Sequence, residues 1–175
     1  MIDLLEQAFV DRLKLKLPAF KVEPFPDAPE AYPFTKATST LLVNYGGSTY
    51  GADKSAAPLH TERQARVVVT ILTRKLRGTT GVVTTVHEVM KSLYGWRPER
   101  RVETPVEGGD PIVTWVPLGF NAVGLVDDKH VGHESGVWRW DVTFRVGGVV
   151  VQDLADLTGP QFKKASALRG EGGCS

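Results

Sequence analysis

The segment Gly136–Val146, GVWRWDVTFRV, alternates apolar and polar side chains along its whole length. Its even positions are apolar: Trp138, Trp140, Val142, Phe144 and Val146. Its odd positions are polar: Arg139, Asp141, Thr143 and Arg145. Because successive side chains of a strand point to opposite faces, the pattern predicts a strand with an aromatic, core-facing side and a charged side. The chain is therefore expected to fold around a β-sheet, with the charged side facing water or a polar partner.

Length and composition indicate a single globular domain. Of the 175 residues, 42% are hydrophobic and 23% are charged, as in ordinary soluble domains. We expect residues 1–151 to form this domain, and residues 152–175, which lose periodicity and end in Gly and Ser, to form a flexible or partner-bound arm. The 21 basic and 20 acidic residues give a net charge of +1, which disfavours nucleic-acid binding as the main activity.

The sequence favours a reducing compartment. Its one cysteine, Cys174, cannot form a disulfide within the chain. The N-terminal segment MIDLLEQAFVDRLKLKL has charges among its apolar residues and is not expected to be a signal peptide. No run approaches the roughly 18 apolar residues of a membrane span. We therefore expect assembly in a cytosol and no membrane partner.

Hydrophobic periodicity and turn residues predict the elements. Helices are expected at Ile2–Leu15 and Thr79–Tyr94, the second capped by Thr79 or Thr80 and ended by Gly95. Strands are expected at Phe20–Glu23, Thr38–Tyr45, Glu62–Lys75, Val113–Val126 and Gly136–Val151. Loops are expected at Gly46–Pro58, Arg97–Asp110 and Asp127–Ser135. Together these elements predict an α+β fold, a largely antiparallel or mixed sheet of about five strands packed against two main helices.

One motif has the residue types of a metal site. His130 and His133 form H-x-x-H, with Asp127, Asp128 and Glu134 nearby, and imidazoles with carboxylates are the ligands that a catalytic zinc ion uses. A small metal-dependent hydrolase is therefore one alternative. The neighbouring Gly and Ser residues favour instead a solvated turn between two strands.

No other segment has the spacing of a catalytic or cofactor site. Gly46, Gly47 and Gly51 lack the spacing of a phosphate-binding loop. Cys174 lies in a Gly-Gly-Cys-Ser terminus without a base nearby, and no serine lies in a G-x-S-x-G turn. We predict no catalytic residue, no cofactor-binding residue, no metal ligand and no cofactor, and hence a protein that is not an enzyme.

A small basic cluster follows the second predicted helix. It consists of Trp96, Arg97, Arg100 and Arg101. An aromatic residue beside arginines suits nucleic acid or an acidic protein surface, but the near-neutral net charge favours a solubilising rim.

Five segments, taken in order, resemble one known family. They are Phe25-Pro26-Asp27, LLVNYGGSTYG, ERQARVVVTILTR, the helix end LYGWRP and the closing GVWRWDVTF. Over residues 1–151 this order resembles the tail terminator family of Mu-like phages and prophages, which are tail-completion proteins. The segment DDKHVGHES and the residues after Val151 depart from the pattern, so their roles stay open.

The resemblance implies a fold similar to the lambda-type tail terminator and a structural role in the virion. Such proteins form a homo-hexameric ring at the head-proximal end of the tail tube, and of the sheath where the tail contracts. The ring stops tail polymerisation and offers a surface for head-completion and connector proteins, while DNA passes only transiently through its lumen. The implied location is the virion tail, with assembly in the host cytoplasm. The family has no catalytic residues to transfer.

Two alternatives stay within the structural class, namely a head–tail adaptor or connector and a minor tube protein. A closed ring needs two different contact patches on each protomer. The long loops expected at residues 46–59 and 97–111 could supply such contacts, and a neighbour could cover the half-apolar outer face of Glu62–Lys75. We also expect Asp53–Pro58 and Gln152–Ser175 to be mobile in an isolated protomer.

Overall fold

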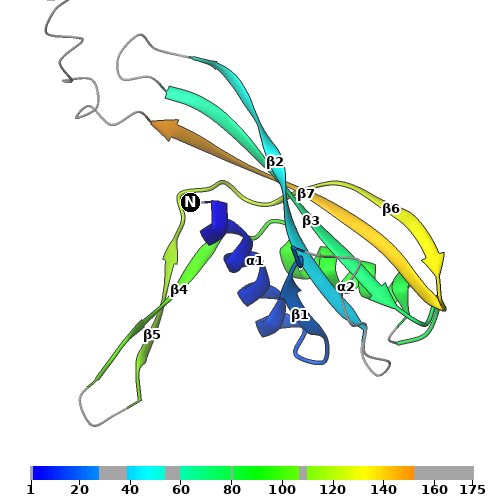
Figure 1. The fold of residues 1–175 in the computed structure, drawn as a ribbon. Coiled ribbons are helices and arrows are strands. Elements are labelled where there is room, and N and C mark those ends of the chain that lie inside the picture. Colours follow the sequence, from blue (N-terminus) through cyan, green and yellow to red (C-terminus); the bar gives the residue numbers. More distant parts are fainter. Residues whose placement is uncertain (1, 28–38, 54–59, 80, 107–109, 152–175) are drawn as a thin grey trace, which may run out of the picture. The chain divides into compact units, whose positions relative to one another are not determined.

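A computed structural model describes residues 2–27, 39–53, 60–79, 81–106 and 110–151 (Figure 1). Contacts divide the chain into two compact units, which we describe separately. Of the described residues, those up to 49 and from 64 to 148 form the larger unit, and those from 50 to 63 and from 149 to 151 form the smaller unit. The predicted arm, residues 152–175, and residues 54–58 of the segment Asp53–Pro58 lie outside the described residues, so their expected mobility stays a prediction, as does the single domain over residues 1–151.

The described elements are two helices and seven strands, in the order α1 Ile2–Lys16, β1 Lys21–Pro24, β2 Thr40–Asp53, β3 His60–Thr73, α2 Val82–Leu93, β4 Glu99–Thr104, β5 Ile112–Pro117, β6 Gly124–Glu134 and β7 Val137–Val151. Five strands form a sheet in the order β1-β2-β3-β7-β6, and β4 pairs with β5 in a separate two-stranded sheet. The five-stranded sheet is mixed, because β1 pairs with β2 in parallel and β6 pairs with β7 antiparallel. This confirms the predicted α+β class.

One apolar core lies between the helices and one face of the sheet. Helix α1 contributes the fully buried Leu5, Phe9 and Leu13, and helix α2 contributes Val82, Val89 and Leu93. The strands contribute alternate residues, among them Leu41, Val43, Val67, Val69, Ile71, Val142, Phe144 and Val146. Helix α1 contacts α2 and β1, and Glu6 of α1 accepts a 3.0 Å hydrogen bond from the backbone N–H of Tyr45 in β2. Both described helices therefore lie on this side of the sheet, and no described helix covers the opposite face.

Strand β7 follows the predicted alternation on its apolar side from Val142 to Val146, whereas Thr143, predicted on the side facing water or a polar partner, is buried. Val142, Phe144 and Val146 are fully buried, and Phe144 packs against Phe9 with ring centroids 6.3 Å apart. Trp138 and Trp140, expected in the core, are only half-buried and lie at its edge. Their rings pack on histidines of the neighbouring strand β6 instead.

Three segments predicted as loops are strands. Strand β2 continues through Gly46 to Asp53, β4 lies within Arg97–Asp110, and β6 includes most of Asp127–Ser135. The single strand expected at Val113–Val126 is divided into β5 and the start of β6. In each case the side chains on both faces are largely polar, glycine or exposed, so apolar alternation gave no signal.

Helix α2 begins without the expected threonine cap. Its N-cap residue is Gly81, which makes no side-chain cap. The backbone N–H groups of Val82 and Val83 instead donate to the carbonyl oxygens of Lys75, at 2.9 Å, and Leu76, at 3.4 Å. These bonds satisfy donors that a helix start usually leaves to a polar side chain. The expected stop is confirmed, since Gly95 has a φ of 77°. In the described part of the chain, no helix is long and apolar enough to cross a membrane.

Candidate functional site

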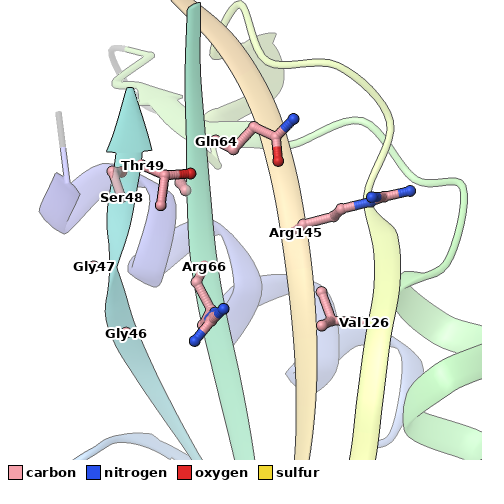
Figure 2. A pocket seen from close by; sticks show the side chains of 9 residues that line it. Gly46, Gly47, Ser48, Thr49, Gln64, Arg66, Val126 and Arg145 are labelled. Carbon is pink, nitrogen blue, oxygen red and sulfur yellow. The ribbon is translucent and has the colours of Figure 1, made fainter. Parts of the chain in front are cut away.

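The helix-free face of the sheet has a depression of about 320 Å³ (Figure 2). Strands β2, β3, β7 and β6 line it side by side. The lining residues are Gly46, Gly47, Ser48, Thr49, Gln64, Ala65, Arg66, Val126 and Arg145. All of them belong to the larger unit.

Strand alternation positions the two arginines of this depression. In β3, Ala65 and Val67 are buried while Gln64 and Arg66 are exposed on the other face. In β7, Phe144 and Val146 are buried while Arg145 is exposed. Because β3 and β7 are neighbours in the sheet, both guanidinium groups lie on the same open face (Figure 2).

Two glycines on the flanking strands leave room for the arginine side chains. A Cβ on Gly46 of β2 would lie 3.4 Å from Cγ of Arg66. A Cβ on Gly124 of β6, which pairs with Arg145, would lie 3.0 Å from its Nε. The stems of both arginines therefore extend across a strand that has no side chain at that point.

The positive charge of this site is not balanced locally. Within the described residues, neither Arg66 nor Arg145 forms an ion pair or a side-chain hydrogen bond, and no carboxylate lines the depression. The next arginine along β7, Arg139, lies 3.7 Å from the carboxylate of Asp141, which also accepts a 2.7 Å hydrogen bond from Thr70. Guanidinium groups bind carboxylates and phosphates in bidentate fashion. The Arg66–Arg145 pair is therefore suited to hold an anionic group.

Comparison with known proteins places the chain in a family. The model of the family described as Gp37 protein matches residues 9–104. The chain belongs to the Gp37 family. The match extends from α1 to the end of β4 and includes Arg66 but not Arg145.

The Gp37-family chain is also similar to a chain in the virion of a native gene transfer agent (GTA) particle. The two share 14% sequence identity with a TM-score of 0.48, over 83% of this chain and 95% of the other. Comparison with curated protein sequences finds no match.

In this Gp37-family protein the histidines of the H-x-x-H motif pack against tryptophans. Both lie on strand β6, where His130 pairs with Trp140 and His133 with Trp138. The ring centroids are 5.4 Å apart in the first pair and 4.3 Å apart in the second. Asp128 accepts a 3.1 Å hydrogen bond from Nε1 of Trp140. Among the residues with described positions, no three His, Cys, Asp or Glu side chains are grouped to hold a metal ion.

The other sequence candidates are dispersed. Gly46, Gly47 and Gly51 lie in strand β2 rather than in a loop before a helix, so they form no phosphate-binding turn. Cys174 lies outside the described residues. Trp96 of the basic cluster packs edge-on against Phe9, with ring centroids 5.6 Å apart.

Sequence reasoning missed the Arg66–Arg145 pair. Each residue occupies a predicted polar position of its own strand, so the signal for exposure was present. That β3 and β7 are neighbours depends on strand pairing, which local periodicity does not reveal.

Proposed function

We propose that the protein is a non-enzymatic structural protein of a phage-type virion, and specifically a tail terminator. It would form a ring of six copies at the head-proximal end of the tail tube, and of the sheath if the tail contracts. The ring would stop tube polymerisation and offer a surface to head-completion and connector proteins, while DNA passes through its lumen.

The placement of the resembling segments carries this proposal. LLVNYGGSTYG lies in β2, ERQARVVVTILTR lies in β3 except for its last residue, and GVWRWDVTF lies in β7 except for its first. These are three adjacent strands of the sheet. LYGWRP begins at the last residue of α2 and contains Trp96, whose ring packs on Phe9 of α1. Most residues of these segments belong to the larger unit, where their strands are neighbours in one sheet. Membership in the Gp37 family agrees with a phage structural protein.

The open sheet face supplies a contact suited to assembly. Arg66 and Arg145 lie exposed and unpaired within the described residues, and a carboxylate on another virion protein would complete their hydrogen bonds. We therefore assign the arginine pair to a contact with an acidic surface of a partner in the tail.

Deleting the gene tests the function directly. Lysates of the deletion strain, viewed by electron microscopy, should contain overlong tails without heads, because nothing stops addition of tube subunits. Supplying the gene on a plasmid should restore tails of uniform length. Headless tails of normal length would contradict termination and support the head–tail adaptor alternative instead.

A further inference from the structure

The hairpin of β4 and β5 exposes apolar side chains that the described chain does not cover. All six residues of β5 are exposed, and Ile112 and Trp115 retain 59% and 37% of their accessible surface. The hairpin has contact with α1 through β4. A two-stranded sheet on its own is only marginally stable in water. Such an apolar, exposed sheet is typical of an interaction surface.

The strand register divides the hairpin side chains between two faces. Trp115 pairs with Arg101, Val113 with Glu103 and Pro117 with Glu99, so these six residues share one face, which we call the Trp115 face. Arg101 and Glu103 form an ion pair on it at 2.6 Å. Glu99 has no ion-pair partner among the described residues. The Trp115 face therefore presents an aromatic side chain beside an uncompensated carboxylate.

A second apolar surface lies on α2. Helical spacing brings Val83, His87, Met90, Lys91 and Tyr94 to one side of this helix. Val83 and Tyr94 retain 59% and 69% of their accessible surface. A cavity of about 440 Å³, which we call the α2 cavity, lies here. It is lined by Leu125 of β6 and by four of these side chains, His87, Met90, Lys91 and Tyr94. Lys91 forms no ion pair within the described residues.

We propose that the Trp115 face of one protomer docks into the α2 cavity of a second copy of this chain. The hairpin offers an aromatic side chain and the cavity is lined mainly by apolar atoms. The carboxylate of Glu99 and the ammonium of Lys91, neither of which has an ion-pair partner among the residues with described positions, have opposite charges. Trp115 and Tyr94 both remain exposed in one protomer, so no described residue of the same chain covers either of them. Two different patches joined in this way form a heterologous contact, which closes into a ring when the rotation permits.

This inference rests on the proposed ring for its biological role, but its test does not. Trp115→Glu removes the aromatic side chain of the Trp115 face and leaves the α2 cavity unchanged. Tyr94→Glu alters the α2 cavity and leaves the Trp115 face unchanged. Each variant alone should self-associate about thirtyfold or more weakly than wild type in sedimentation velocity, as expected for loss of an interface anchor. An equimolar mixture of the two variants should form particles of two chains and no larger, since one intact contact remains.

Leu15→Glu is the matched control, because Leu15 is an exposed apolar residue outside both surfaces. It should associate as wild type does, and circular dichroism should show all three variants folded. Wild-type protein that stays monomeric at every concentration would overturn the inference, as would variants that associate normally or a mixture that stays monomeric. The gene-deletion phenotype is independent of these results, so failure of the interface and failure of the terminator function are distinguishable.

Discussion

At the scale of single residues, the ring of Phe120 lies directly against Gly148 of β7. A Cβ on Gly148 would lie 2.8 Å from Cδ1 and 3.1 Å from Cε1 of Phe120. The ring is only 8% exposed, so its neighbours prevent it from moving aside. Glycine at this position therefore allows the aromatic ring to lie directly on the strand.

Gly148→Ala should lower the free energy of unfolding by about 1–3 kcal/mol, the usual cost of overpacking. Urea denaturation followed by tryptophan fluorescence measures the change. Gly132→Ala on β6 is the control, since a Cβ there meets nothing within 4 Å, and it should change stability by less than about 0.5 kcal/mol. Equal stability of the two variants would show that Phe120 does not press on the strand.

At the scale of elements, strand β7 is buried to different extents along its length. Phe144 is fully buried in the core, whereas Trp138 is half-buried and stacks on His130 and His133 near the chain reversal at residues 135–136. The alternation in the sequence is uniform, so it cannot reveal this gradient.

The gradient predicts unequal effects of truncation. Phe144→Ala should destabilise the protein by about 3–5 kcal/mol, because it removes a large side chain from a packed core. Trp138→Ala should cost about 1–2 kcal/mol, since it removes a partly exposed ring and its stacking contacts. Thermal unfolding monitored by circular dichroism compares the two. A Trp138 variant as unstable as the Phe144 variant would mean that the hairpin end of β7 is core after all.

Elements with one apolar face could be predicted from the sequence, and elements without one could not. The buried Val67, Val69 and Ile71 reveal β3 because they recur at every second position, and the β-branched residues between Val67 and Ile71 also favour a strand. Strand β6 carries charged or polar side chains from Asp127 to His130 on both faces, and β4 does the same from Glu99 to Arg101. Their strand conformation comes from pairing with β7 and β5. The arginine site could not be predicted for the same reason, because Arg66 and Arg145 lie on separate strands whose pairing the local sequence does not show.

At the scale of the whole molecule, positive and negative charges are nearly equal in number, but only some of the arginines lie beside a carboxylate. The net charge is +1, and Arg101 and Arg139 have carboxylates beside them. Arg66 and Arg145 have none among the described residues, although both lie on the open face of the sheet. A near-neutral protein with two free arginines in one depression is suited to a local acidic contact and not to general binding of polyanions.

This contact predicts a defect in assembly without a defect in folding. The double variant Arg66→Gln/Arg145→Gln should unfold within about 0.5 kcal/mol of wild type, because both side chains are exposed. Expressed in the gene-deletion strain, it should leave many tails overlong and headless, since the proposed acidic partner loses its charge-assisted hydrogen bonds. Electron microscopy gives the fraction of tails of normal length. Arg139→Gln is the control, because it removes an arginine already paired with Asp141; expressed in the same strain, it should restore normal tails. If the double variant restored normal tails to the same extent, the arginine pair would have no role in the tail.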